Sequence, residues 1–219
     1  MLFDFGGTLD ADGLPWRERC LRLLREEGVA VANERFDPAF YAADDRLVGR
    51  IPPSLGLRDT VRALVGGLTE ALSLHDTMLT ERLASRFADD ACDQLRTNAR
   101  VLGTLSLRYN LGVVSNFYGN LRAVCDEAGI SRFLKVIVDS TQVGWTKPDP
   151  RIFRYALDAL ALTPADVTFV GDSLARDMAG ARMVGMPHIW LGDPARERRP
   201  CCPDDRVISS LKELEALLA

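Results

Sequence analysis

The chain has 219 residues, of which 47% are hydrophobic and 26% are charged, a mixture typical of a folded globular protein and not of a disordered one. Its formal net charge of −4 argues against a protein that binds nucleic-acid backbones through a basic surface. No apolar run approaches the ~18–20 residues of a membrane span and the N-terminus lacks the pattern of a signal peptide, so we expect a cytoplasmic protein.

The chain begins with the apolar residues Met1–Phe3, which run directly into Asp-Phe-Gly-Gly-Thr. This order predicts a buried strand that ends at Asp4 and opens into a glycine loop. A strand of this length is short for the middle of a sheet. Either the strand is short, or the natural chain starts further upstream.

Residues 14 to 98 show helical periodicity and no convincing strand. A glycine at position 28 is a plausible stop for the first helix, and Pro52-Pro53 and Leu74-His75-Asp76 interrupt the later pattern. We therefore predict an all-helical segment of roughly four helices. The predicted helices are Trp16–Glu27, Phe36–Val48, Leu57–Leu74 and Met78–Leu95.

After residue 100 short apolar runs alternate with helical patterns, which favours a parallel sheet. The predicted strands are Leu111–Val114, Lys135–Val138, Thr168–Val170, His188–Leu191 and Val207–Ile208. The predicted helices are Gly119–Ala128, Pro150–Leu160, Leu174–Val184 and Leu211–Leu218, with Asp193–Asp205 as a loop. The sheet is therefore expected to be discontinuous in sequence, with the helical segment inserted after its first strand.

The five cysteines are odd in number and contain no CxxC pair, so the sequence predicts neither a disulfide framework nor a zinc site. We expect buried free thiols in a reducing cytoplasm. A redox-active vicinal pair is the alternative at Cys201-Cys202, and nothing nearby supports it. The cysteines are Cys20, Cys92, Cys125, Cys201 and Cys202.

Ligands of open parallel sheets lie at the carboxyl ends of the strands, and the residues suited to catalysis are found there. Asp4 follows the first strand, Ser115-Asn116 follows the second, and Asp172 follows Thr168–Val170 with Asp177 five residues beyond it. Lys147 lies in a loop just before a helix whose start is favoured by prolines.

With these motifs the chain resembles the haloacid dehalogenase-like superfamily. The matching pieces are DFGGTLD, VVSN, the lysine of GWTKPDPRIF, and VGDSLARDMAGA, in the order and spacing of that superfamily. The resemblance covers essentially the whole chain. It implies an α/β fold with a three-layer Rossmann-like parallel-sheet core, formed by residues 1–12 and 98–219. It also implies a small all-helical cap at residues 13–97, which would close over the site and exclude water.

The resemblance further implies a phosphatase-type reaction. Asp4 would be the nucleophile that forms an aspartyl phosphate. Mg²⁺ would be held by the carboxylates of Asp4 and Asp172 and by the backbone carbonyl of Gly6, since this cation prefers a few protein oxygens. The substrate would be a small phosphorylated metabolite, with no nucleic-acid or membrane partner.

The remaining motif residues are implied to contact the phosphoryl group. Ser115, the Lys147 ammonium, and backbone N–H groups around Gly7 and Asn116 would bind its oxygens. Asp177 would hold Lys147 or a metal-bound water.

One position departs from the superfamily pattern. Typical phosphatases carry an acid/base aspartate two residues after the nucleophile, where this chain has Gly6. The loss of a positioned acid/base costs roughly 10²–10⁴ in rate. Either the leaving group needs little help, or another group such as Asp10, Asp12 or His75 supplies the proton.

Three other functions are alternatives to the phosphatase. A carbon–halogen hydrolase needs no acid, but such relatives generally replace the metal-binding pair that this chain keeps as Gly171-Asp172. A phosphonate hydrolase needs a cap lysine, and the only lysines are Lys135, Lys147 and Lys212. A phosphate-binding pseudo-enzyme that has lost turnover is the third alternative, and retention of the four catalytic motifs argues against it.

Overall fold

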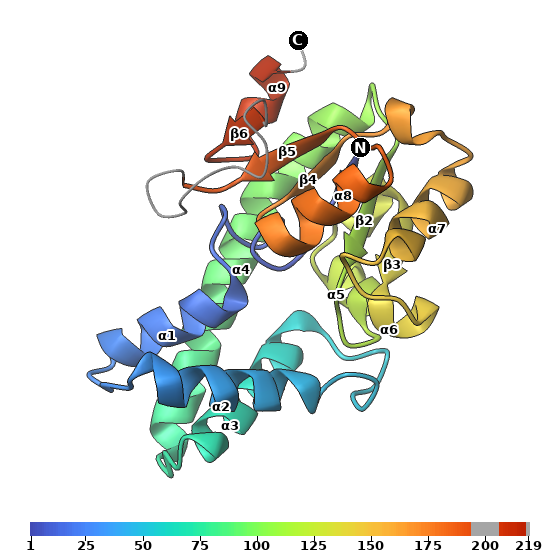
Figure 1. Cartoon of the computed structure of the whole chain (residues 1–219). Helices are drawn as coiled ribbons and strands as arrows, with labels where there is room; N and C mark the ends of the chain where they lie inside the picture. The colour runs from blue at the N-terminus through green and yellow to red at the C-terminus, as the bar shows by residue number, and fades with distance from the viewer. Residues whose placement is uncertain (194–205, 218–219) are drawn as a thin grey trace.

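The computed structural model describes residues 1–193 and 206–217. Within these residues the strands form one parallel sheet in the order β3-β2-β1-β4-β5-β6 (Figure 1). The strands are β1 Leu2–Phe3, β2 Leu111–Ser115, β3 Leu134–Asp139, β4 Phe169–Gly171, β5 His188–Leu191 and β6 Arg206–Ile208. The predicted strands and the parallel sheet are confirmed, and the predicted loop lies outside the described residues apart from Asp193.

The first strand is short but central. Phe3 is in register with Val113 of β2 on one side and with Val170 of β4 on the other. The chain builds β2 and β3 on one side of β1 and β4 to β6 on the other, so the order reverses between β1 and β4. Such a switch point leaves a crevice at the carboxyl ends of the two strands.

Neighbouring residues of a strand point to opposite faces, and the buried side chains divide accordingly. Leu2 belongs to one apolar cluster, together with Phe169 and Trp190. Phe3 and Val170 belong to the other. Helices cover both faces, and this confirms the predicted three-layer α/β core.

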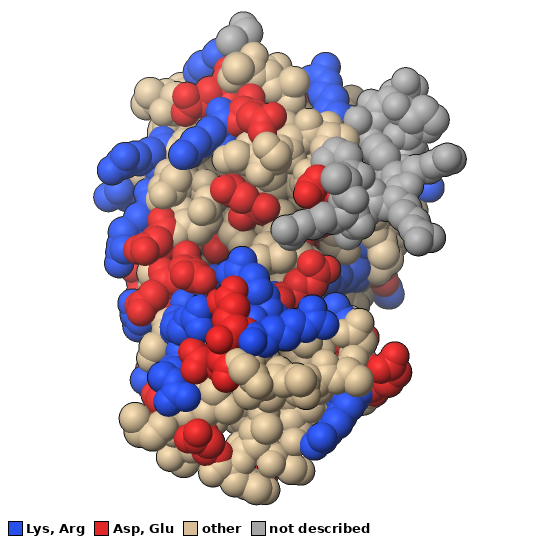
Figure 2. Space-filling model, turned by 90° about the vertical axis from the view of Figure 1, so that its left-hand side faces the viewer, with Lys and Arg blue, Asp and Glu red and all other residues tan. Residues whose placement is uncertain are grey.

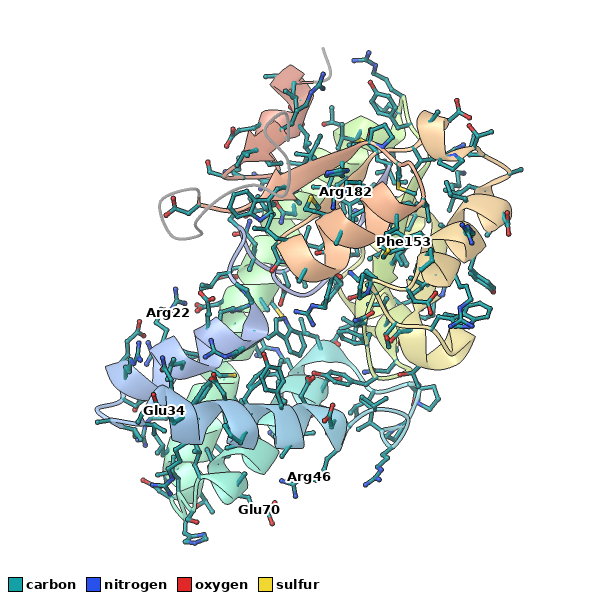
Figure 3. The ribbon with its side chains drawn as sticks, in the orientation of Figure 1. Arg22, Glu34, Arg46, Glu70, Phe153 and Arg182 are labelled. Atoms are coloured by element: carbon teal, nitrogen blue, oxygen red, sulfur yellow. The ribbon has the colours of Figure 1, made fainter. Side chains whose placement is uncertain are left out.

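The helices of the core follow the expected alternation. They are α5 Leu121–Glu127, α6 Ser140–Val143, α7 Pro150–Leu160, α8 Ala179–Met183 and α9 Glu213–Leu217, with a π-helical turn η3 at Leu174–Met178 and short 3₁₀ turns η1 Ser131–Phe133 and η2 Pro164–Asp166. Phe153 of α7 is fully buried and lies beside α8, where it faces Gly180 (Figure 3). Its ring packs on Phe169 of β4 with a centroid separation of 5.1 Å.

The inserted segment forms four helices, as predicted. They are α1 Trp16–Glu26, α2 Asn33–Asp45, α3 Leu57–Ala71 and α4 Thr77–Ser106. The predicted end of the last helix at Leu95 is wrong, because buried Val101, Leu102 and Leu105 continue its apolar stripe into the core cluster. One continuous helix therefore runs from the inserted helices to the sheet (Figure 1), and the predicted boundary at 97/98 falls inside it.

Charged side chains of both signs are interleaved over the helical region on the face shown in Figure 2. Arg86 contacts Glu27, and Arg46 lies 3.3 Å from Glu70 on the helical region in Figure 3. Ion pairs at the protein surface contribute little to stability, because solvent screens them. Among the described residues no helix is long and apolar enough to cross a membrane.

Three of the cysteines can be placed. Cys20 and Cys125 are buried, Cys92 is partly buried, and all three are free thiols. Burial raises the pKa of both Cys20 and Cys125 to about 12. Cys201-Cys202 lies outside the described residues.

Candidate active site

Asp4 directly follows β1 and lies in the crevice at the switch point. Its backbone N–H donates to the carbonyl of Val170 at 2.9 Å, which ties it to β4. Its carboxylate oxygen Oδ1 accepts a 2.7 Å hydrogen bond from the hydroxyl of Ser115, the last residue of β2. Both side chains are buried, so the sheet itself fixes the predicted nucleophile and the predicted phosphoryl-binding hydroxyl side by side.

Lys147 brings a positive charge into the same crevice. Its Nζ atom lies 2.6 Å from Oδ1 of Asp4 and 2.7 Å from Oδ1 of Asp177, and its side chain is 2% exposed. Burial lowers the pKa of this ammonium, but the attraction of Asp177 and Asp4 outweighs burial and leaves the pKa above its ordinary value. Lys147 is therefore a fixed cation next to the predicted nucleophile.

Asn116 holds the backbone of Lys147 in place. Its side-chain oxygen accepts from the Lys147 N–H at 2.7 Å, and its amide nitrogen donates to the Lys147 carbonyl at 3.1 Å. This pair of bonds links the loop after β2 to the loop before α7. The side chain of Asn116 thus positions the lysine, which the sequence did not indicate.

Asp172 follows β4 and faces Asp4 across the crevice. Its Oδ1 accepts from Thr8 Oγ1 at 3.0 Å, and its backbone carbonyl accepts from the Trp190 indole at 2.9 Å. Burial raises the pKa of Asp172 well above its ordinary value, and the charges of Asp4 and Asp177 raise it further. The contact with Thr8 was not predicted, although this threonine belongs to the first motif.

The carboxylates of Asp4, Asp172 and Asp177 converge. One oxygen from each lies within 4.8 Å of the others, and all three side chains are buried. Burial and the neighbouring carboxylate Asp4 also raise the pKa of Asp177, despite the opposing effect of Lys147. Three carboxylates facing one ammonium leave an excess of buried negative charge, which is costly without a counter-ion. The cluster fits Mg²⁺, which prefers carboxylate oxygens and carries the charge that would balance the site.

Asp139 fixes the loop that carries the second motif. Its Oδ2 accepts from the N–H groups of Gly119 at 2.9 Å and Leu121 at 3.0 Å, and its Oδ1 accepts from Thr141 at 3.0 Å. Burial raises the pKa of Asp139, and these donors lower it. Asp139 is the last residue of β3. In the sequence only this position at the end of a strand marks it as a candidate.

Asp10 is not placed to act as the missing acid. Its carboxylate is fully buried and accepts hydrogen bonds from the Gly7 N–H at 2.7 Å and the Trp16 indole at 2.6 Å. Arg19 completes the set at 2.9 Å. The Gly7 N–H already donates to Asp10, so this hydrogen bond does not support the predicted role of that N–H in binding phosphoryl oxygens. Gly7 is nevertheless required, since its φ is +89° and a Cβ would lie 2.5 Å from Oδ2 of Asp172.

The other candidate acids differ in position. His75 is exposed in the turn between α3 and α4, at the end of the helical region away from the sheet (Figure 1). Asp12 is exposed beside the site and lines a pocket of about 340 Å³ together with Asp172 and Glu18. Burial raises the pKa of Asp12, and a hydrogen bond from Ser210 lowers it. His75 is thus remote from the catalytic cluster, whereas Asp12 borders it.

Comparison with known proteins agrees with this geometry. A family model described as haloacid dehalogenase-like hydrolase matches residues 1–185. The chain belongs to the haloacid dehalogenase-like hydrolase family. The resemblance predicted from the four motifs is therefore confirmed.

Relatives with assigned names differ in how much of the chain they match. The mouse haloacid dehalogenase-like hydrolase domain-containing protein 3 is 37% identical over 231 residues, covering 98% of this chain and 91% of its own. The bovine protein of the same name is 34% identical over 118 residues, or 53% of this chain and 47% of that protein. The phosphoserine phosphatase of Thermus thermophilus is 34% identical over 87 residues, which cover 40% of this chain and 35% of that protein. The matched segments thus span less than half of the last two proteins.

Solved structures share the fold. A dehalogenase with an intermediate complex superposes with a TM-score of 0.64 at 21% identity, covering 99% of this chain and 95% of that one. A magnesium-bound structure of the HAD-hydrolase YfnB from Bacillus subtilis gives a TM-score of 0.60 at 21% identity, covering 99% and 96%. At this identity the likeness establishes the α/β fold, and it does not separate phosphatase from dehalogenase chemistry.

Proposed function

We propose that this hydrolase is a Mg²⁺-dependent phosphatase that forms an aspartyl phosphate on Asp4. The observation that carries the proposal is the placement of Asp4 within 2.7 Å of both Ser115 Oγ and Lys147 Nζ, beside two further buried carboxylates. A carboxylate among a cation, a hydroxyl and a metal-binding cluster suits phosphoryl transfer, which depends on positioning and charge neutralisation. The phosphatase names among its relatives point the same way.

Four residues of the chain would have distinct roles in the reaction. A carboxylate oxygen of Asp4 bonds to phosphorus while the bond from phosphorus to the leaving oxygen breaks. The Ser115 hydroxyl and the Lys147 ammonium turn from Asp4 toward the phosphoryl oxygens and stabilise their charge. Asp177 keeps Lys147 in position throughout, since it holds the same ammonium at 2.7 Å. Water then attacks phosphorus while the bond between phosphorus and the Asp4 oxygen breaks; the water proton leaves with the inorganic phosphate or passes to solvent, and the Asp4 carboxylate is restored.

The metal would be held by the Asp4 and Asp172 carboxylates and the Gly6 carbonyl. When bound, it supplies positive charge to the phosphoryl oxygens and balances the buried carboxylates. Thr8 orients Asp172 for this role through its 3.0 Å hydrogen bond.

The leaving group must depart without a proton from position 6. Gly6 has no side chain, and the nearby Asp10 is committed to three donors. The substrate class that fits is a small phosphate ester or acyl phosphate whose leaving oxygen is stable as an anion. Of the three candidate acids that the sequence suggested, Asp12 is the one at the edge of the site, from where it could supply a proton.

The four inserted helices would act as a cap that selects the substrate. They contact the loop after β2, which carries the second motif. The Tyr118 hydroxyl donates to Oδ1 of Asp44 on α2 at 2.5 Å, and the Asn120 amide donates to the carbonyl of Leu55 at 2.8 Å. These bonds join the helical region to the wall of the crevice, where closure would exclude water.

A substrate panel with and without Mg²⁺ tests the proposal. It would contain aryl, acyl and alkyl phosphates, with 2-chloropropionate as the halogenated substrate. We expect Mg²⁺-dependent phosphate release, fastest for aryl and acyl phosphates, and its loss in Asp4→Asn. Metal-independent halide release would instead identify a dehalogenase, and phosphate binding without turnover would identify a pseudo-enzyme.

A further inference from the structure

Gly6 and Gly7 are adjacent glycines with different reasons to be glycine. Gly7 has a left-handed backbone, and a Cβ there would collide with Asp172. Gly6 has no positive φ, so its backbone would accept a side chain. The three atoms nearest to a Cβ at position 6 all belong to the Trp16 indole, with Nε1 at 3.2 Å, Cδ1 at 3.5 Å and Cε2 at 3.6 Å. The indole of Trp16 is thus what a side chain at position 6 would meet.

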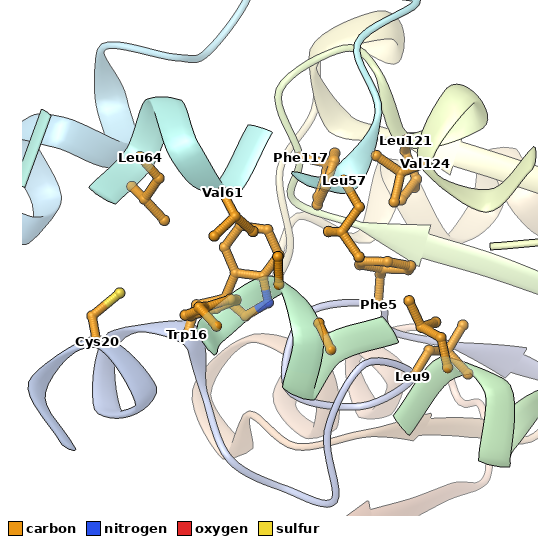
Figure 4. Packing of buried hydrophobic residues seen from close by; sticks show 14 of the residues in the cluster. Phe5, Leu9, Trp16, Cys20, Leu57, Val61, Leu64, Phe117, Leu121 and Val124 are labelled. Atoms are coloured by element: carbon orange, nitrogen blue, oxygen red, sulfur yellow. The ribbon is translucent and has the colours of Figure 1, made fainter. Parts of the chain in front are cut away.

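Trp16 cannot easily move aside, because buried groups hold it from several directions. Its indole N–H donates to Oδ2 of Asp10 at 2.6 Å. Its ring packs edge-on against Phe87 of α4 at 5.2 Å and Phe117 of the second-motif loop at 5.9 Å. Figure 4 shows the indole inside the cluster that also contains Phe5 and Phe117.

Arg19 braces the same network. It pairs with Asp10 at 2.9 Å and donates to the carbonyl of Phe87 at 3.1 Å, with its guanidinium 4.0 Å from the centre of the Phe87 ring. Arg19 and Asp10 are both buried. A displaced indole would therefore leave Asp10 without one of its donors and would disturb a buried ion pair.

We infer that Trp16 is a specificity-determining residue, which occupies the side of Gly6 where an acid/base carboxyl would stand and so restricts the enzyme to leaving groups that need no proton. The inference rests on the proposed phosphatase function. It explains the departure from the superfamily pattern as a coupled exchange, in which glycine at position 6 leaves room for the indole of Trp16. A carboxyl at position 6 would become useful only after the indole is made smaller.

Kinetics of four proteins test this coupling: wild type, Gly6→Asp, Trp16→Leu and the double variant. The substrates are p-nitrophenyl phosphate, whose leaving group needs no acid, and glycerol phosphate, whose leaving group does. We expect Gly6→Asp alone to give no gain on glycerol phosphate. The double variant should raise kcat/KM on glycerol phosphate by about 10²-fold or more over wild type, the lower end of the range for a positioned acid.

Two controls separate acid catalysis from a general effect of space. The double variant Gly6→Asn with Trp16→Leu has nearly the same shape but no acidic proton to transfer, and it should show no gain on glycerol phosphate. The aspartate double variant should also acquire a fall in kcat/KM at high pH that wild type lacks. A full gain from Gly6→Asp alone, or none from the double variant while its activity on p-nitrophenyl phosphate persists, would overturn the inference.

Stability measurements test the steric claim without activity. Gly6→Ala should lower the urea midpoint of wild type, because its methyl group meets the indole, and should lower it less in Trp16→Leu. Trp16→Phe offers a second background if the leucine variant does not fold. An unchanged midpoint for Gly6→Ala in wild type would contradict the inference. Failure of every protein to release phosphate would instead count against the proposed function.

Discussion

Replacing Lys147 by methionine removes a buried cation and keeps an unbranched chain of similar length. Among the described residues Lys147 is the only cation paired with Asp4 or Asp177, and its side chain is 2% exposed. The loss of one partner of a buried pair costs about 3–5 kcal/mol, because the other charge stays buried and uncompensated. For a chain of 219 residues this corresponds to a fall in Tm of roughly 6–20 °C.

The size of this effect should depend on pH. Asp172 and Asp177 already have raised pKa values in the presence of Lys147. A carboxyl whose pKa is raised by folding stabilises the protein below its unfolded pKa, and this contribution is lost as the pH rises through the folded pKa. Without the lysine both pKa values rise further, so the variant should be much less stable than wild type at pH 8 and closer to it at pH 5.

Urea unfolding of metal-free protein at the two pH values measures the difference. Lys135→Met is the matched control, since Lys135 is exposed on β3 and its replacement should change stability by less than about 0.5 kcal/mol. Adding Asp177→Asn to Lys147→Met should restore part of the loss, because it removes one of the unpaired charges. A loss below about 1 kcal/mol at both pH values would refute the account of a charge-coupled cluster.

Three further predictions concern other buried charges and thiols. Mg²⁺ at 100 times the Kd measured at pH 8 should stabilise the protein by about 2.7 kcal/mol at that pH, and the same concentration should stabilise it less at pH 5, where protons compete for the carboxylates; Asp172→Asn should abolish this in thermal unfolding. Arg19→Met should destabilise the protein by about 3–5 kcal/mol in urea, because Asp10 would lose its buried partner; a change below 1 kcal/mol would count against that pair. Cys20 and Cys125, with pKa values of about 12, should resist iodoacetamide at pH 8 until the protein is unfolded. Alkylation of either cysteine in the folded protein, detected by mass spectrometry, would contradict this prediction.

The strand ends could be predicted from the sequence because each is marked by apolar residues followed by polar ones. The sequence predicts Asp4 and Asp172 at the ends of two strands, and the structure shows that these strands are neighbours in the parallel sheet, which brings both carboxylates to one edge. The end of α4 could not be predicted in the same way. The mostly polar run Arg96–Arg100 follows Leu95 and favours a helix end there, but in the structure the helix continues through it and its apolar stripe resumes at Val101.

The contact of the Trp16 indole with position 6 could not be predicted from the sequence either. The sequence indicates Trp16 only as the start of a helix and Asp10 only as a candidate catalytic acid. Their contact depends on how α1 enters the core, and on the position of Arg19 one turn along that helix. Periodicity predicts which face of a helix is buried, but it does not predict that the side chain of Trp16, the first residue of α1, packs against Gly6.

In the proposed mechanism Asp4 carries the phosphoryl group during turnover. Hydroxylamine converts an acyl phosphate to a hydroxamate, so the enzyme can be incubated with p-nitrophenyl phosphate, Mg²⁺ and hydroxylamine, digested, and examined by mass spectrometry. We predict a hydroxamate at Asp4 that requires both substrate and Mg²⁺. Steady turnover of the substrate while Asp4 stays unmodified would contradict this mechanism. Turnover retained in Asp4→Asn would contradict it as well.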